Sequence, residues 1–236
     1  QVGNELAQER KEAAREIREN EAREQMNESM RKGYEHIAEE QRKDLQEREV
    51  TNSKQAASEN LNITKLAQEL NSAGLARAAQ QMTEKNEILN SAETKEDVIR
   101  IEADIKEHKQ ISTELMTDIK KNGGDVITGA DKFADKKVRD YEDRALAETQ
   151  RLMEVSKGKP YEAEVNQLIN ERLNDITSKA ESFTEDMRMI ARENKGIDIE
   201  KVTATVKDLD NQFTKDYQSM QQEFESIVNS HKEIKP

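Results

Sequence analysis

The chain has 236 residues, a formal net charge of −12 and no cysteine. Only 33% of the residues are hydrophobic and 3% are aromatic, whereas 37% are charged. A compact globule of this length needs more apolar side chains, so the composition favours long helices with narrow apolar seams, or partial disorder. The acidic charge argues against sequence-independent binding to nucleic acid or to an anionic membrane surface. No apolar run is long enough for a membrane-spanning helix.

Residues 1–50 are dense in alternating charge and predict one long charged helix or arm. Acidic residues stand four positions before basic ones, as in Glu28 and Lys32, which stabilises an exposed helix by about 0.2–0.5 kcal/mol per pair. One short apolar stripe interrupts the charges: Met26, Met30, Tyr34 and Ile37. Such a stripe usually packs against the rest of its own chain. The alternative is a docking patch for a partner protein, because Met adapts to varied surfaces.

Residues 51–122 predict the central helices. The polar triplet Thr51-Asn52-Ser53 is expected to end the first long helix and start the next one. A further helix is expected over 94–121, because Thr94 precedes Asp97 at the spacing of a capping box.

Residues 123–130 predict a Gly-rich loop, and Asp131 is expected to cap the helix that follows it. Residues 131–236 predict a C-terminal helical bundle. Seven of the eight Phe and Tyr residues come after position 130, and large aromatic side chains dominate core energetics. The better-packed core is therefore expected in 131–230.

A helical hairpin over 161–230 is the clearest structural prediction. Apolar residues recur every three or four positions along Tyr161–Ile190 and again along Val202–Ile227, which places one narrow stripe on each of two helices. Between them, Gly196 suits the left-handed end of a helix and Asp198 suits the start of the next. A short turn folds two such helices back antiparallel, stripe against stripe.

These patterns together predict an all-α protein, an elongated antiparallel helical bundle or coiled coil with a C-terminal helical hairpin. A homo-oligomer would satisfy the same stripes. The glycine-containing breaks let the chain fold back on itself, which favours the intramolecular bundle.

His108 lies on the apolar stripe of the helix expected over 94–121. A polar residue on such a seam is ordinarily satisfied by a cross-helix carboxylate or by water. The sharper hypothesis is a pH-sensitive position in the seam, because histidine changes its charge near physiological pH.

The sequence carries no signature of an enzyme. It has no Gly-rich phosphate loop, no HExxH motif and no GxSxG motif. Its three histidines are far apart in the sequence, and Asp125, Asp131 and Asp135 lack the spacing of a calcium loop. We therefore expect no enzymatic activity, no metal and no cofactor.

The expected function is that of a non-catalytic structural or protein-interaction component, a spacer, scaffold or assembly protein that acts through helix faces. The alternative is a secreted or soluble effector or adhesin-like helical protein that binds one partner through its N-terminal patch. Partners are expected to be proteins, including a second copy of the chain, and not nucleic acid. The compartment stays open: a soluble chain that begins at Gln1 fits an exported or proteolytically matured protein as well as a fragment.

Overall fold

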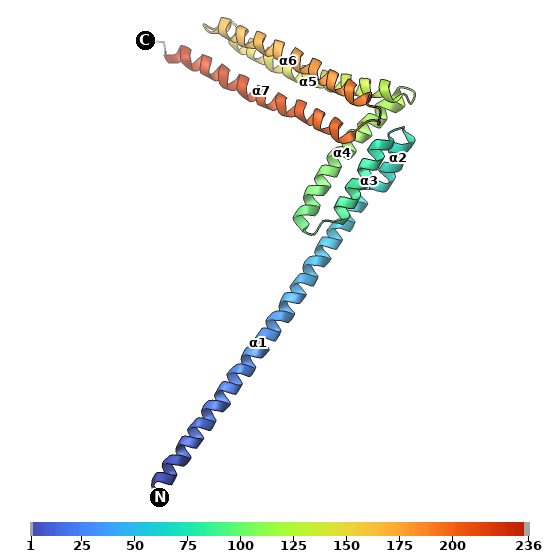
Figure 1. Ribbon diagram of the computed structural model, residues 1–236. Coiled ribbons are helices and arrows are strands. Elements are labelled where there is room, and N and C mark those ends of the chain that lie inside the picture. Colours follow the sequence, from blue (N-terminus) through green and yellow to red (C-terminus); the bar gives the residue numbers. More distant parts are fainter. Residues whose placement is uncertain (1, 234–236) are drawn as a thin grey trace.

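The computed structural model describes residues 2–233, and over this range the chain is all-α (Figure 1). The described helices are α1 (Val2–Leu61), α2 (Ile63–Ser72), α3 (Ala76–Asn90), α4 (Lys95–Lys121), α5 (Val126–Ser156), α6 (Glu162–Ala191) and α7 (Ile199–Glu233). The predicted fold class, an elongated helical bundle with a C-terminal helical hairpin, is confirmed.

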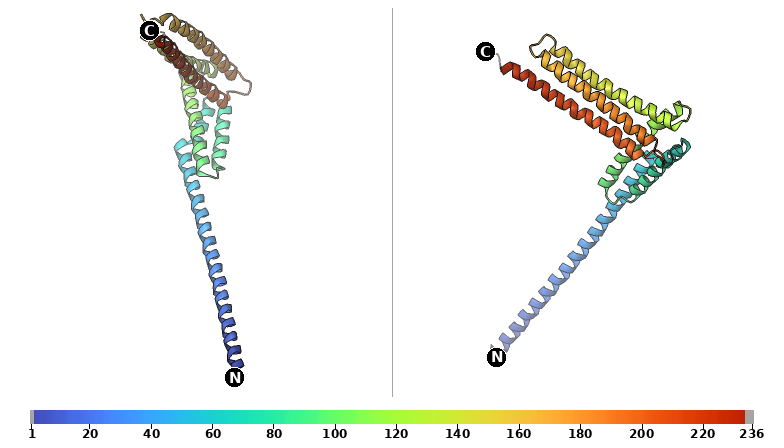
Figure 2. Two further views of the ribbon diagram at one scale, coloured as in Figure 1. Left: turned by 90° about the vertical axis from the view of Figure 1, so that its left-hand side faces the viewer. Right: turned by 45° about the horizontal axis from the view of Figure 1, so that its top comes forward.

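The helices form an arm and two packed modules (Figures 1 and 2). The arm is Val2–Glu49, the part of α1 that stands clear of the rest of the molecule. The stem module consists of the end of α1 with α2, α3 and α4. The bundle module consists of α5, α6 and α7, which lie side by side and leave the stem module in a different direction from the arm.

α1 is one continuous helix of 60 residues, about 90 Å long at 1.5 Å per residue. The predicted break at Thr51-Asn52-Ser53 is therefore wrong. The Thr51 hydroxyl donates to the Glu47 carbonyl (2.9 Å), so this side chain is satisfied within the helix instead of capping a new one. Beyond it, Ala57 and Leu61 are buried, and α1 packs against α4. Tertiary packing thus extends the helix past its polar triplet.

The main hydrophobic core runs through the stem module and into the near end of the bundle module. Seven of the twelve largest fully buried side chains lie in the stem module: Leu70, Leu75, Met82, Leu89, Ile105, Leu115 and Ile119. The expectation that the better-packed core lies in 131–230 is therefore wrong. Aliphatic side chains fill the stem, whereas only three of the seven aromatic side chains after position 130 are buried: Phe133, Tyr141 and Phe183. A second, smaller cluster lies in the bundle module: Leu152, Val165, Leu168, Ile169 and Met220.

α5 begins earlier than the sequence predicts. A loop was expected over 123–130 with Asp131 as the cap, but the helix starts at Val126. Asp125 is the cap, and its carboxylate accepts a hydrogen bond from the backbone N–H of Thr128 (2.8 Å). This hydrogen bond lowers the pKa of Asp125.

The hairpin of α6 and α7 agrees with the pattern that predicts it. Gly196 takes a φ of +92° in the turn. Asp198 caps α7, since its Oδ1 accepts hydrogen bonds from the backbone N–H groups of Glu200 (3.0 Å) and Lys201 (3.2 Å). Thr94 caps α4 as predicted. α6 packs more extensively on α5 than on α7, so the hairpin is part of a three-helix bundle.

A polar junction joins α3 to the turn between α6 and α7. The Arg77 guanidinium contacts the carboxylates of Glu193 (2.9 Å) and Asp198 (3.0 Å). Gln81 donates to Asp198 (2.7 Å) and accepts from the backbone N–H of Ile199 (2.8 Å). Burial alone would raise the pKa of Asp198, but the hydrogen bonds from Gln81 and the α7 backbone, together with Arg77, lower it. This α3 junction holds the bundle module against the stem module.

Candidate interaction site

The four residues Met26, Met30, Tyr34 and Ile37 form an exposed apolar surface on the arm, which we call the arm patch. Steps of four, four and three place them on one face of α1. Met26 and Tyr34 are 66% and 67% exposed, and Met30 and Ile37 are each 52% exposed. The interpretation that this stripe packs against the rest of its chain is wrong, because every residue of the arm except Ala14 is exposed. Partner docking by the arm patch stays a prediction.

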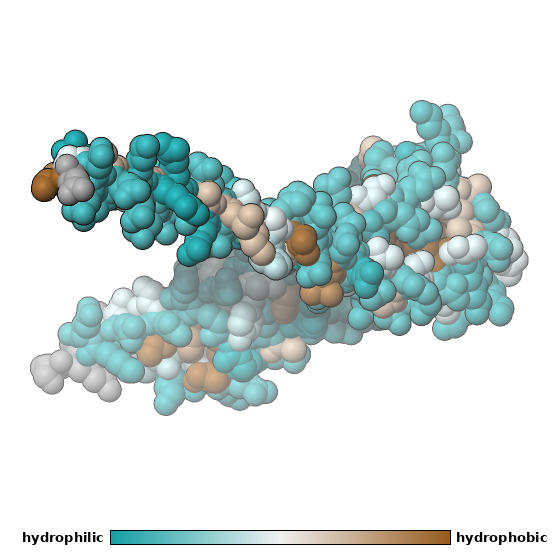
Figure 3. Space-filling view, turned by 90° about the horizontal axis from the view of Figure 1, so that it is seen from below, coloured by the Kyte–Doolittle hydropathy of each residue, from teal (hydrophilic) through white to brown (hydrophobic). Residues whose placement is uncertain are grey.

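The rest of the arm is a solvated helix. Its surface is mainly hydrophilic, with only scattered apolar side chains (Figure 3). Charged pairs run along it: Lys32 contacts Glu28 as predicted (3.8 Å), and Arg15 contacts Glu19 (3.3 Å). A helix that is polar on all sides is stabilised by such pairs and by its anchored end. The arm patch departs from this pattern because it groups four large apolar side chains on one face. Each of them would gain about 1.5–3 kcal/mol from full burial.

His108 lies in the buried seam of α4, as predicted. Its Nδ1 is 2.7 Å from the Asp104 carbonyl oxygen, which only accepts, so Nδ1 donates. The Asp104 carboxylate also contacts Lys85 of α3 (2.9 Å), which reaches Glu200 of α7 as well (3.0 Å). Burial alone would lower the pKa of Lys85, but these two carboxylates raise it. The pH sensitivity of the His108 seam stays a prediction.

A buried charge cluster in the bundle module was missed by the sequence reasoning. Arg172 of α6 is buried, with its guanidinium 3.6 Å from the Glu148 carboxylate of α5 and 3.1 Å from Asp216 of α7. Asp175 lies 3.3 Å away on the same helix. Burial raises the pKa of Glu148 more than Arg172 lowers it. The sequence does carry a signal for this burial, because Arg172 lies three positions after Ile169 and therefore on the apolar face of α6.

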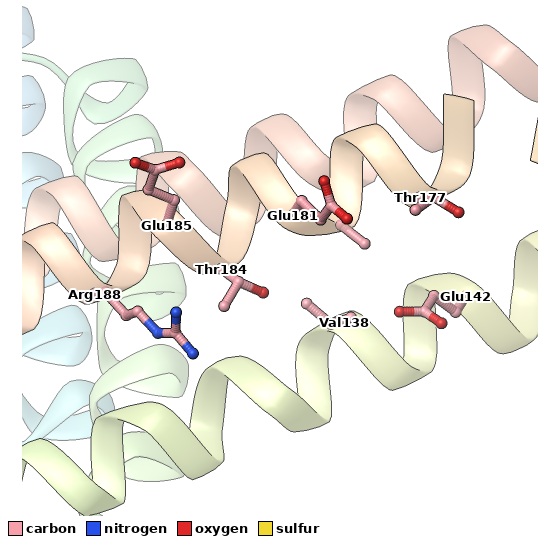
Figure 4. A pocket seen from close by; sticks show the side chains of 8 residues that line it. Val138, Glu142, Thr177, Glu181, Thr184, Glu185 and Arg188 are labelled. Carbon is pink, nitrogen blue, oxygen red and sulfur yellow. The ribbon is translucent and has the colours of Figure 1, made fainter. Parts of the chain in front are cut away.

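Two surface grooves are large enough to receive part of another helix. One lies between α2 and α4, has a volume of about 850 Å³ and is lined by Met116 and Gly123 among others. The second lies between α5 and α6, has a volume of about 640 Å³ and is lined in part by Val138 and Thr184 (Figure 4). We call the second the α5–α6 groove.

The described part of the chain offers little for other kinds of site. Between residues 2 and 233, no three or more His, Cys, Asp or Glu side chains are grouped so that they could hold a metal ion. Within that range, none of the helices combines the length and the apolar character that crossing a membrane requires. No protein-family model matches the chain, and no curated protein or solved structure matches it.

Proposed function

We propose that the chain is a non-catalytic structural or protein-interaction component whose arm presents a docking patch to a protein partner. The supporting observation is the arm patch, four large apolar side chains that the described chain leaves uncovered. At 1.5 Å per residue, Ile37 stands about 30 Å along α1 from the buried Ala57. The arm therefore acts as a spacer that holds the arm patch clear of the two packed modules.

The arm patch suits docking of a helix into a groove of the partner, with anchors at positions i, i+4, i+8 and i+11. Its helix is already formed, so binding does not bear the entropic cost of folding it. Four fully buried anchors contribute on the order of 6–12 kcal/mol. Association itself costs about 4–15 kcal/mol, so the arm patch alone gives weak, reversible docking. A long-lived assembly needs further contacts around it.

A spacer or scaffold and a single-partner effector differ in stoichiometry. An assembly component forms complexes with several copies or several proteins, whereas an effector or adhesin-like protein forms a complex with one partner. Mass in solution, measured by light scattering on a sizing column at two protein concentrations, separates them. A stoichiometric oligomer favours assembly through the chain itself, and a monomer that elutes early for its mass favours a heterologous partner.

The arm patch is tested by replacing its four residues with Ala, the best helix former, so that α1 keeps its helicity. The matched control replaces four charged residues on the same turns with Ala: Glu28, Arg31, Lys32 and Glu35. The control keeps the net charge, because it removes two acidic and two basic groups. We expect the control and the unmodified chain to capture the same protein, and the patch variant to lose it at unchanged circular dichroism. Equal capture by the patch variant would exclude the proposed role.

A further inference from the structure

All the sulfur in the chain belongs to its eight methionines, because the sequence contains no cysteine. The fold divides these methionines by their exposure. Three are buried in the two hydrophobic clusters: Met82, Met187 and Met220. Four are exposed to solvent: Met26, Met30, Met153 and Met189. The eighth, Met116, is half-buried. An oxidant that attacks sulfur therefore reaches the surface methionines directly, whereas the packed modules shield those of the core.

Met26 and Met30 differ from the other two exposed methionines in their setting. They are four positions apart, so their side chains lie one helical turn apart on the same face of α1. The arm stands clear of the packed modules, which leaves both thioethers open to solvent (Figure 1). Met153 and Met189 lie singly on α5 and α6. Oxidation of the arm therefore changes two of the four apolar side chains of the arm patch at once.

A hydroperoxide oxidises an exposed thioether by transfer of one oxygen atom. With hydrogen peroxide, a lone pair of the methionine Sδ attacks one peroxide oxygen, the O–O bond breaks and an S–O bond forms. The departing hydroxide takes the proton of the transferred oxygen and leaves as water. The sulfur loses two electrons to the peroxide, and the product is methionine sulfoxide, which is polar where the thioether was apolar.

The added oxygen has different consequences in the free and in the docked arm. In the free arm water solvates it, because both side chains are more than half exposed, and the backbone hydrogen bonds of α1 are untouched. In a docked arm it is buried against apolar groups, where a polar atom without a hydrogen-bond partner is costly. We propose that Met26 and Met30 are an oxidation site, at which a hydroperoxide makes the arm patch polar without unfolding the chain. This inference rests on the proposed function of the arm patch and names its regulation.

Peptide mass spectrometry after treatment with hydrogen peroxide maps the site. We expect sulfoxide to form at Met26 and Met30 at least about tenfold faster than at the three core methionines, because a buried sulfur reacts only through local opening. At the stage where only exposed methionines are oxidised, the melting temperature should equal that of the untreated chain. Equal rates at all methionines, or a lower melting temperature at that stage, would overturn the proposal.

The effect on the arm patch is measured in a chain that carries Met153→Leu and Met189→Leu, so that Met26 and Met30 are its remaining exposed methionines. The matched control adds Met26→Leu and Met30→Leu, because Leu has nearly the volume and helix propensity of Met but cannot be oxidised. Each chain is compared with its own untreated form on a phenyl matrix, which serves as an apolar probe. Peroxide should shorten the retention of the first chain and leave that of the control unchanged. An equal change in both would overturn the proposal.

Docking is measured with the protein that the unmodified chain captures in the test of the arm patch. Catalase removes the peroxide before mixing, so only the chain is oxidised. We expect oxidation to weaken capture by the first chain at least about tenfold, since the burial of two apolar side chains is lost. The two methionine sulfoxide reductases, one for each epimer, should restore it.

The four-Ala patch variant separates the two ways in which this account can fail. Capture that the four-Ala variant loses, but that oxidation of Met26 and Met30 leaves undiminished, would overturn the oxidation site and leave the proposed function standing. Capture that survives the four Ala replacements would exclude the proposed function and, with it, the effect of oxidation on docking.

Discussion

Gly129 of α5 lies directly against Ile119 of α4, and a Cβ atom at Gly129 would come within 2.5 Å of the Ile119 Cα. The two helices therefore cross at backbone contact, just after the turn that joins the stem and bundle modules. We predict that Gly129→Ala destabilises the fold, although Ala favours a helix by about 1 kcal/mol. Backbone overlap cannot be relieved by a rotamer change, and overpacking costs about 1–3 kcal/mol. Thermal unfolding followed by circular dichroism measures the loss.

Gly33 provides the matched control, because a Cβ atom there meets nothing within 4 Å. Gly33→Ala should stabilise the arm by about 1 kcal/mol through helix propensity alone. Slower amide hydrogen exchange around position 33 would report this gain. A gain in stability for Gly129→Ala as well as for Gly33→Ala would contradict the close approach of α5 to α4 at Gly129.

We predict that Asp198→Ala costs on the order of 2–3 kcal/mol of stability, because it removes the cap of α7, one of the two carboxylates that contact Arg77, and the acceptor of the Gln81 amide N–H. Asp208→Ala, at an exposed position of the same helix, should change stability by less than about 0.5 kcal/mol. Chemical denaturation of both variants gives the comparison.

The same residue predicts a pH dependence. The pKa of Asp198 is lowered in the fold, so its stabilising contribution is present above the ordinary carboxyl pKa and is lost as pH falls through the folded pKa. The stability difference between the unmodified chain and Asp198→Ala should therefore shrink on acidification. A difference that grows toward low pH would show that the junction does not hold Asp198 in its charged form.

The pH dependence of stability that we expect from Glu148 has the opposite sign. Burial raises the pKa of Glu148, so on acidification the folded chain binds this proton at a higher pH than the unfolded chain does. The contribution of Glu148 to stability therefore falls as pH rises through its folded pKa. Glu148→Gln stays neutral at every pH and leaves Arg172 with Asp175 and Asp216. The melting temperature of the variant minus that of the unmodified chain should increase from mildly acidic to neutral pH. A constant or decreasing difference would argue against a buried, charge-penalised carboxyl.

Local signals in the sequence are sufficient for the features that depend on neighbouring residues. The apolar spacing of α6 and α7, the turn at Gly196 and the caps at Thr94 and Asp198 are all readable from a few adjacent positions. Each of these features is determined by backbone hydrogen bonding and helical periodicity within one segment.

The features that were missed depend on contacts between distant segments. The continuation of α1 through Thr51 follows from packing farther along the helix, and Gly129, which lies within α5, leaves room for the close approach of α4 because it has no Cβ atom. Arg172 is buried because Glu148 and Asp216 come from two other helices. The arm patch itself is visible as a pattern, but only the arrangement of residues 2–233 shows that these residues leave it uncovered.

The central claim is that the arm is one straight helix that holds its patch away from the packed modules. Spin labels at Arg18→Cys and Asn52→Cys bracket the arm patch, the second label lies within the polar triplet at 51–53, and the chain has no other cysteine. We predict a narrow distance distribution centred at about 50 Å, the length of 34 residues of helix. A broad distribution, or one centred at a much shorter distance, would mean that the arm bends or folds back, and would contradict the account.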